Sequence, residues 1–482
     1  MKNNKKKKRN KNIIGISLGI LLLIITIIFL CLINAINLIP NNYFAIIAVI
    51  IAIMTLVIET FLLIKKKNVI LKGIKIFCCI ISIFLIAIYS FGIHYLSKTV
   101  NFLDNISKVE EEITNYYIIV LKDSIYQETS DLYNKSLLYL ENTNQEVIDS
   151  IKLDLSYTTT KDTNEIKNKL YNQEIDAILI SDITKNKLEE DDENFNTTTK
   201  ILETISIKNK IEDITKKVSI KNTPFNVLIS GIDAYGDINQ TSRNDVNIVA
   251  TINPNTNEIL LTSIPRDYYV QLHGTTGYKD KLTHASYYGT NIAVKTIEDI
   301  LDIDINYYVK VNFSTVIELV DELGGIEIYA DQSVYLRPNC NIKEGYNTVN
   351  GTCALAFSRE RHSYADGDRH RGRNQQQVIE AIFKKVSTGS TIINEYTNIL
   401  KVLDGKFATN MDINEVLNLV KYEVNDLKNY HIESIQVDGY GSMGKTYSYP
   451  YEDLWIMIPY EDTINNAKET INKVLNNQSV KG

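Results

Sequence analysis

The feature that most constrains this chain is a series of three long apolar runs at its start. They extend from about Ile13 to Ile36, from Tyr43 to Ile64 and from Ile74 to Leu96. Each run reaches or exceeds the roughly 20 residues that an α-helix needs to cross a bilayer. A cleaved signal peptide has a single, shorter apolar segment, so three successive runs predict three transmembrane helices and permanent anchoring.

The cations beside these runs predict their orientation. Lys5 to Lys8 and Arg9 precede the first run, and Lys65 to Lys67 with Lys72 and Lys75 lie between the second and third. The loop between the first two runs has no cation. By the positive-inside rule, the N-terminus is cytoplasmic and everything after Leu96 is extracellular, in a multi-pass protein of the cell membrane. A nucleic-acid patch is the weaker interpretation, since these cations flank apolar spans.

The charge balance also argues against nucleic acid as a partner. Residues 1–98 contain 13 Lys or Arg and one acid, so the whole-chain charge of −7 leaves −19 on residues 99–482. An acidic exterior repels the phosphate backbone of nucleic acids. A local cluster of arginines within this acidic part is therefore more informative than it would be elsewhere.

The length beyond the apolar runs predicts two further domains. We expect a membrane region at 1–98, a small α/β accessory domain with a linker at 99–200, and a large domain at 201–482. In the small domain the pattern predicts strands at Tyr116–Leu121 and Ala177–Ile180 and helices at Glu128–Glu141 and Asn164–Leu170. The acidic stretch Glu189–Thr199 is typical of a linker or a long loop, and the amphipathic segment Lys200–Lys217 follows it and leads into the next domain.

The large domain is predicted to be a three-layer α/β/α domain with a mixed central sheet, because strands and helices are interspersed along it. The expected strands are Phe225–Ser230, Val246–Ile252, Glu258–Ser263, Tyr268–Leu272, Tyr307–Val311, Ile326–Tyr329 and Ile432–Val437. The expected helices are Asn291–Ile300, Ser314–Leu323, Asp368–Val386, Ile392–Leu403, Ile413–Asn429 and Glu461–Leu475.

The stretch FSRERHSYADGDRHRGRNQQQ, from Phe357 to Gln377, holds five arginines beside three carboxylates. On a helix, Asp368, Gly372, Gln375 and Ile379 share one face, and Arg371 lies at its edge. The apolar end of this face must meet a core, so its polar beginning also points inward. Buried charges need partners, and planar guanidinium groups bind two oxygens at once, which predicts a phosphate or pyrophosphate pocket. A solvated basic start of a helix, balanced by acids, is the alternative.

Acids and cations from earlier segments are expected at the same edge of the sheet. Asp233 follows the first strand and Asp245 begins the second, so the two carboxylates can converge and hold Mg²⁺ together with phosphate oxygens. Both also suit turns and caps, which is the alternative for each.

Three further segments supply cations. Pro265 ends a strand, so Arg266 leaves the sheet at this edge. Lys281 fits either the same site or an ordinary surface position. Arg359 and Arg361 share one side if their segment is extended, with Glu360 facing away.

Cys340 and Cys353 are the only cysteines outside the apolar runs. A disulfide between them is plausible outside the cell, where oxidising conditions prevail, and two free thiols are the alternative. The sequence does not place them near each other.

Six segments carry a resemblance to one family: SRNDVNIVATINP, LTSIPRDYYV, KDKLTHASYYG, INYYVKVNF, LVDELGGIEI and SRERHSYADGDRHRGRNQQQ. In this order they resemble the blocks of the LytR-CpsA-Psr family, and the three-pass anchor with a small domain is similar to its capsule-type members. Asn244 is a departure, because the family often has Ser there, and we expect it to tune activity.

The resemblance implies an extracytoplasmic, Mg²⁺-dependent phosphotransferase. It would move a phospho-glycopolymer (teichoic acid or capsular polysaccharide) from a polyprenyl pyrophosphate lipid to peptidoglycan. Asp233 and Asp245 would hold the metal, and Asp368, Arg266 and Arg371 would be the catalytic residues. The pyrophosphate would be bound by Arg243, Arg266, Lys281, Arg359, Arg361, Arg371 and Gln375.

Two other functions fit the same residues. With water as acceptor, the site would act as a polyprenyl pyrophosphate phosphatase. A membrane sensor or regulator that binds a wall precursor without turnover belongs to a different class. The acid pair and the full set of arginines favour catalysis.

Overall fold

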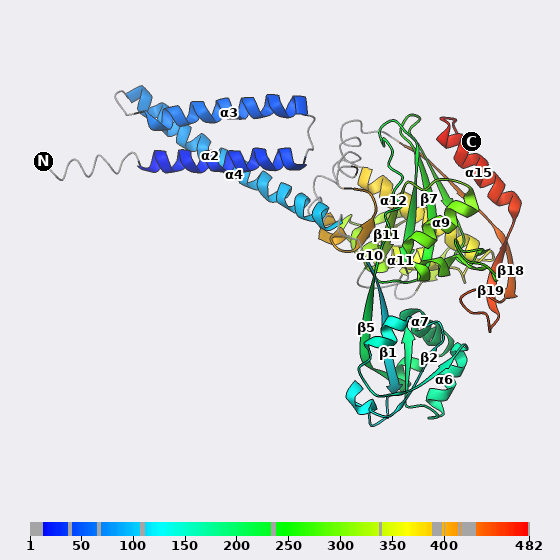
Figure 1. Ribbon diagram of the computed structural model, residues 1–482. Helices are drawn as coiled ribbons and strands as arrows, with labels where there is room; N and C mark the ends of the chain where they lie inside the picture. The colour runs from blue at the N-terminus through cyan, green and yellow to red at the C-terminus, as the bar shows by residue number, and fades with distance from the viewer. Residues whose placement is uncertain are drawn as a thin grey trace. The chain divides into compact units, whose positions relative to one another are not determined.

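The computed structural model describes residues 13–36, 41–64, 69–106, 111–232, 238–336, 340–387, 398–399, 401–412, 415 and 430–480. Contacts divide the chain into two compact units (Figure 1). One holds residues 1–105 with segments 395–404 and 412–428, and the other holds the rest.

The first unit contains three apolar helices, α2 (Ile13–Ile36), α3 (Asn41–Leu63) and α4 (Val69–Ile106). All three are long and apolar enough to cross a membrane, as the sequence predicts. Their outward faces carry exposed Ile, Leu and Phe side chains, which suit lipid rather than water. Between them, Phe29 of α2 stacks on Tyr89 of α4 with ring centroids 4.9 Å apart.

The small domain, residues 111–210, is a five-stranded mixed sheet in the order β3-β2-β4-β1-β5. Its strands are β1 (Glu111–Leu121), β2 (Ser136–Leu140), β3 (Ser156–Thr160), β4 (Ala177–Ser181) and β5 (Thr199–Lys210). Helices α5 (Gln145–Ser150), α6 (Thr163–Tyr171), α7 (Asp182–Asp191) and α8 (Phe195–Thr198) follow the strands. Ile178 and Leu179 of β4 are both fully buried and belong to different apolar clusters, so both faces of the sheet are covered.

Two predictions for this domain are wrong. Glu128–Glu141 is not a helix, because it forms a short 3-10 turn (Thr129–Leu132) and then β2, whose Leu137 and Leu138 are buried between neighbouring strands. Tertiary burial on both faces outweighs the local helix preference here. Glu189–Thr199 is not a linker, because it completes α7, forms α8 and begins β5. Since β5 continues to Lys210 in the same sheet, the expected boundary at residue 200 falls inside a strand.

The large domain is built on a six-stranded sheet in the order β16-β11-β6-β7-β8-β17. Its strands are β6 (Phe225–Ile232), β7 (Asn244–Asn253), β8 (Glu258–Ser263), β11 (Tyr307–Asn312), β16 (Phe407–Thr409) and β17 (His431–Gln436). β11 pairs with β6 and β17 pairs with β8 in parallel, and the other pairings are antiparallel. The predicted mixed sheet is confirmed.

Helices cover both faces of this sheet, which confirms the three-layer architecture (Figure 1). On one face α9 (Thr290–Leu301) and α15 (Glu461–Leu475) pack through Ile297 and Ile471 on Leu228 and Val249. The other helices are α10 (Phe313–Glu322), α11 (Gly351–Arg359) and α12 (Asp368–Ser387). α12 is held to the sheet by the amide of Gln376, which donates to the carbonyls of Leu261 in β8 and Ile435 in β17.

Four short hairpins complete this domain. They are β9 (Tyr269–Val270) with β10 (Asp280–Lys281), β12 (Ile326–Ala330) with β15 (Gly345–Val349), β13 (Val334–Leu336) with β14 (Cys340–Ile342), and β18 (Gly439–Gly444) with β19 (Leu454–Pro459). The predicted strands Tyr268–Leu272 and Ile326–Tyr329 are confirmed as β9 and β12, and the sequence analysis missed the other strands of these hairpins. Most are too short for a two-residue alternation to stand out. The predicted helices Ile392–Leu403 and Ile413–Asn429 lie mostly outside the described residues.

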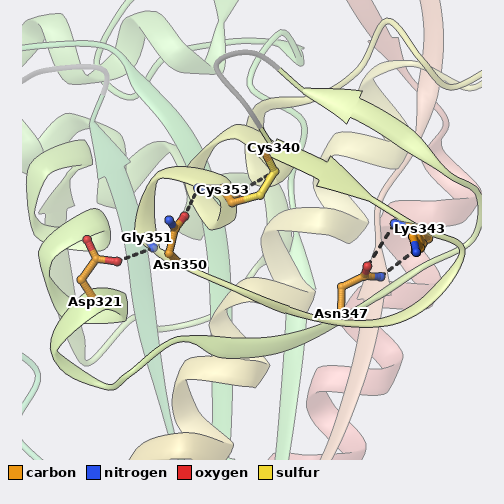
Figure 2. The surroundings of a disulfide bond; sticks show 7 residues. All are labelled: Asp321, Cys340, Lys343, Asn347, Asn350, Gly351 and Cys353. Atoms are coloured by element: carbon orange, nitrogen blue, oxygen red, sulfur yellow. Dashed lines mark hydrogen bonds between the residues drawn. A yellow bond between two sulfur atoms is a disulfide. The ribbon is translucent and has the colours of Figure 1, made fainter.

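Cys340 and Cys353 form a disulfide, with their Cα atoms 5.4 Å apart (Figure 2). The bond ties β14 to the first turn of α11. The same turn is capped by Asn350, whose side chain accepts from the Cys353 N–H, and by Asp321, which accepts from the Gly351 N–H (Figure 2). The start of α11 is therefore fixed covalently and by hydrogen bonds.

Candidate functional site

One edge of the large sheet gathers the ends of four strands. β6 ends opposite the start of β7, and Ser263 at the end of β8 lies beside Gln436 at the end of β17. The first turns of α12 approach this edge closely. A Cβ at Gly372 would lie 2.8 Å from Nε2 of Gln436 and 3.2 Å from Oγ of Ser263. Glycine at this position therefore lets α12 place its neighbouring Arg371 against the strand ends.

Seven charged residues come together at this edge, and we call them the rim cluster. Its members are Arg243, Asp245, Arg266, Asp267, Lys281, Asp368 and Arg371. They come from the start of β7, the segment after β8, the β10 hairpin strand and the start of α12.

Arg266 is central to the rim cluster. Its Nη1 donates to Oδ1 of Asp245 at 2.7 Å, and its Nε lies 3.4 Å from Oδ2 of Asp267. Lys281 reaches the other oxygen of Asp267, with Nζ 3.1 Å from Oδ1. Asp245 and Asp267 are buried, so the two carboxylates hold the cations in place with little help from water.

The α12 residues complete the cluster. Arg371 forms an ion pair with Asp368, three residues earlier on the helix, and both side chains are largely buried. The Gln375 amide lies one turn further and donates to the Asp245 carbonyl at 3.4 Å. The inward-facing polar start of this helix is confirmed, whereas the solvated alternative describes only part of the segment.

The more exposed part of the arginine-rich segment contains Arg369 and Arg373. Arg369 donates from Nε to Oδ1 of Asp438 at 2.6 Å and from Nη2 to the Gly439 carbonyl. Arg373 pairs with Asp366 at 2.5 Å. Both are structural contacts away from the rim cluster.

The pKa values of the aspartates in the rim cluster depend on two effects, burial of the carboxylate and the charges close to it. Burial alone would raise the pKa of Asp267, but Lys281, Arg266 and Arg371 outweigh it and hold this pKa below its ordinary value. The pKa of Asp368 is raised, because burial is only partly offset by the charge of Arg371 and is reinforced by Asp267. The two aspartates thus differ in the direction of their shifts, and Asp368 takes up a proton more readily.

The Nε of Arg266 is held by charge alone. It is buried and lies 3.4 Å from Oδ2 of Asp267, but it makes no hydrogen bond within the described part of the chain. Buried donors without a hydrogen bond are rare, and a ligand oxygen is one group that satisfies them. A guanidinium group beside further cations is the arrangement that binds phosphate oxygens.

Arg243 has a partner that the sequence analysis missed. Its Nη2 lies 2.5 Å from Oε1 of Glu190, at the end of α7 in the small domain. Burial alone would raise the pKa of Glu190, but Arg243 outweighs it and lowers this pKa. The acidic stretch around Glu190 was the available signal, although it was interpreted as a linker.

Arg359 and Arg361 do not share one side of an extended segment, and that prediction is wrong. Arg359 is the last residue of α11, and its guanidinium carbon lies 4.4 Å from the centroid of the Phe313 ring. Arg361 follows the helix with Nε 3.4 Å from Nε2 of His362, and its charge opposes in part the rise in the pKa of Asp368 that burial causes. Arg361 therefore adds its field to the rim cluster, whereas Arg359 packs on α10.

Of the two aspartates expected to hold a metal ion, only Asp245 lies within the described residues. Asp233 lies outside the described residues, and Asp245 already accepts from Arg266. Among the described residues there is no group of three or more His, Cys, Asp or Glu side chains arranged for a metal ion. A carboxylate beside a phosphate site still suits Mg²⁺, which usually takes one or two protein carboxylates and fills its shell with water and phosphate oxygens.

Comparisons with known proteins match this part of the chain. The model of the LytR_cpsA_psr family matches residues 191–456. The chain is 33% identical over 229 residues to a Bacillus cereus protein named polyisoprenyl-teichoic acid–peptidoglycan teichoic acid transferase TagU, covering 47% of this chain and 73% of that one. A protein of the same name from Enterococcus faecalis is 35% identical over 203 residues, covering 42% and 66%.

Solved structures of similar proteins include Bacillus subtilis TagV, with 30% identity, a TM-score of 0.44 and coverage of 53% of this chain and 98% of that one. Another is described as TagT bound to LI-WTA, with 27% identity, a TM-score of 0.43 and coverage of 54% and 94%.

Proposed function

Because the chain belongs to the LytR-CpsA-Psr family, we propose that it is a membrane-anchored transferase that moves a phosphate-linked glycopolymer from a polyprenyl pyrophosphate lipid to peptidoglycan. The relatives named as teichoic acid–peptidoglycan transferases support this proposal. The three apolar helices support it as well, because a lipid-linked donor is reached most directly by an enzyme anchored in the same membrane.

The observation that carries the proposal is the rim cluster around the unsatisfied Nε of Arg266. In the proposed complex, Arg266 and Arg371 bind nonbridging oxygens of the two phosphates, and Lys281 and Arg243 add positive charge. These donors lie in a partly buried site, where an ion pair is stronger than in water. They would stabilise the charge that grows on the leaving phosphate.

In the reaction, a sugar hydroxyl of the acceptor attacks the phosphorus that carries the glycopolymer. A new P–O bond forms to the acceptor, and the bond from this phosphorus to the bridging oxygen breaks, releasing polyprenyl phosphate. The hydroxyl proton must leave at the same time. Asp368, whose pKa is raised by burial, is the candidate to take it and also positions Arg371.

Mg²⁺ dependence is part of the proposal. Asp245, with Asp233 from the segment outside the described residues, would hold the ion, which when bound neutralises phosphate charge as a Lewis acid. A chelator titration with Asp245→Asn as the variant tests this, and transfer that is unchanged by chelator would remove the metal from the proposal.

We also propose that the large domain lies outside the cell. The cation distribution supports this orientation, and so does the Cys340–Cys353 disulfide, because such bonds persist in oxidising compartments. A membrane-impermeant protease applied to intact cells should cleave the small and large domains. If neither domain were cleaved in intact cells, the opposite orientation would be indicated.

The function is tested with the full chain in lipid nanodiscs, lipid-linked polymer, Mg²⁺ and peptidoglycan. Polymer covalently attached to the peptidoglycan is the expected result. Release of free phosphate-terminated polymer would instead indicate a polyprenyl pyrophosphate phosphatase, and binding without turnover would indicate a sensor.

A further inference from the structure

A cavity of about 710 Å³ lies between the small domain and the large domain, and its lining includes none of the seven rim-cluster residues. Its volume falls within the range of about 300–1,000 Å³ that is common for ligand pockets. The small domain contributes residues of β1, β2 and the start of α6 and α7, and the large domain contributes the end of the Leu282–Tyr288 turn and the segment before β19.

Contacts on both sides fix the walls of this cavity. Glu112 of β1 accepts from the Thr290 N–H at 3.1 Å at the start of α9. Lys187 of α7 lies 3.0 Å from Glu452 of the large domain. Two separate elements of the small domain thus contact the large domain through paired polar groups on either side of the cavity.

Tyrosines dominate the lining. They are Tyr116, Tyr287, Tyr288, Tyr447, Tyr449 and Tyr451. Tyr449 is buried and supports the others through edge contact with His284. Tyr288, Tyr447 and Tyr451 are 44%, 40% and 55% exposed, so parts of their rings are open to a ligand.

The shape and polarity of these rings suit sugars. The ring centroids of Tyr288 and Tyr447 lie 5.8 Å apart, and the two ring planes are inclined at 62° to each other. The faces of these rings therefore do not stack on each other. Ring faces are electron-rich and attract the polarised C–H groups of a sugar ring, while Asn142, Thr143 and Asp162 can bind hydroxyls.

Charge decides which sugar polymer fits. The lining contains four acids, Glu112, Glu141, Asp162 and Glu452, and one cation, Lys161. Three of these acids form ion pairs, Glu141 with Lys161, Glu452 with Lys187 and Glu112 with Lys310. The cavity is therefore close to neutral, and its cations are already paired, so it suits a neutral chain better than a polymer with a phosphate in every repeat.

The cavity also lies close to the proposed reaction centre. Thr241 lines it, and Arg243 of the rim cluster follows two residues later, so the two Cα atoms are at most about 7 Å apart. Tyr287 belongs to the lining and to the electrostatic surroundings of Arg243.

We propose that this tyrosine cavity binds a neutral glycan chain and holds the sugar backbone of the peptidoglycan acceptor beside the rim cluster. The identity of the chain rests on the proposed function, whereas binding of a neutral glycan follows from the cavity itself. The small domain would then supply one wall of an acceptor site.

The experiment measures binding of a tetramer of β-1,4-linked N-acetylglucosamine to the full chain in nanodiscs by calorimetry. Wild-type protein should bind it. Tyr288→Ala and Tyr451→Ala should each weaken binding about tenfold, as expected for truncating an aromatic group that contacts a ligand. Tyr288→Phe and Tyr451→Phe keep the rings and should bind nearly as wild type does.

Two matched variants make the result specific. Tyr335→Ala removes an exposed tyrosine of β13 that does not line the cavity, and it should leave binding unchanged. Arg266→Ala should also bind the tetramer normally while losing transfer.

The proposal is overturned if wild type does not bind the tetramer, or if both alanine variants bind as tightly as wild type. It is also overturned if poly(glycerol phosphate) binds instead and the alanine variants lose that binding. Binding of the tetramer without any transfer would uphold the glycan site and refute the proposed function. Transfer without tetramer binding would uphold the proposed function and refute the glycan site.

Discussion

Wholly or partly buried carboxylates occur in both the small domain and the large domain, but their partners differ. In the small domain, Asp176 accepts from the Ser136 N–H, the Ser136 hydroxyl and the Tyr126 hydroxyl. Asp182 likewise accepts from the Asn115 N–H and two side chains. In the large domain, Asp245, Asp267 and Asp368 face guanidinium and ammonium groups instead.

This difference separates structural burial from a candidate site. A carboxylate that accepts hydrogen bonds from several neutral donors is satisfied and has no further need of a ligand. Guanidinium and ammonium groups held by buried acids remain positively charged, and in Arg266 one donor makes no hydrogen bond, so this group of cations suits an anion. Charged side chains that come together from several segments are thus better evidence for a site than the burial of any one acid.

The largest expected effect comes from removing the central cation. Arg266→Ala should lower transfer by about 100-fold to 1,000-fold, because one preorganised contact to the developing charge is lost. The assay is polymer attachment to peptidoglycan, with folding followed by the fluorescence of Trp455, the single tryptophan of the chain.

Arg373→Ala is the matched control for this change. It removes an arginine of the same segment that pairs with Asp366 away from the rim cluster, so transfer should stay within a few-fold of wild type. If Arg266→Ala and Arg373→Ala were equally active, Arg266 could not be distinguished from an arginine with a purely structural role.

Much of this arrangement could be predicted from the sequence. Long helices such as α12 and α15 have clear 3.6-residue patterns, and the buried strands β6, β7 and β8 are continuous apolar runs between turns. Arg266 and Arg371 could be placed at one site because each follows or begins a predicted element at the same edge of the sheet.

The rest depended on contacts distant in sequence. Asp267 was visible beside Arg266, but its pairing with Lys281 arises only when β9 and β10 form their hairpin. Glu190 meets Arg243 across two domains. The helix predicted at Glu128–Glu141 failed for a related reason, because burial of Leu137 and Leu138 in a sheet is decided by strands that follow later in the chain.

The disulfide sharpens the comparison, because the large domain contains Cys340 and Cys353 whereas the small domain has no cysteine. Replacing both Cys340 and Cys353 by Ser should cost about 3 kcal/mol, the entropy of a closed loop of this size, here spanning 13 residues. Unfolding followed by Trp455 in β19 should shift, whereas protection of the small domain in hydrogen exchange should not change.

A reductant offers a second measurement of the same bond. It should lower the stability of wild type and leave the double serine variant unaffected. An equal response of both proteins would mean that the bond does not contribute to the large domain.

Acid sensitivity should also differ between the domains, through Asp267. Since its pKa lies below the ordinary 3.8, the carboxylate stabilises the fold above that pH, and this stability is lost as pH falls through the lowered value. Asp267→Asn should cost about 2–3 kcal/mol at pH 7, because Lys281 loses its charged partner.

The difference in unfolding free energy between wild type and Asp267→Asn, measured with Trp455, should shrink below pH 3.8. A difference that stays constant down to pH 2 would contradict the assignment of this ion pair.

The smallest effect is expected for a carboxylate of the small domain. Asp176→Asn replaces one acceptor oxygen by an amide that faces the Ser136 N–H, which should cost about 1 kcal/mol for the weakened hydrogen bonds. Hydrogen exchange in β1 and β2 should become faster, while Trp455 unfolding and transfer per folded molecule stay the same. If this variant lost transfer without unfolding, the small domain would hold part of the catalytic machinery, and the contrast between its satisfied acids and the rim cluster would fail.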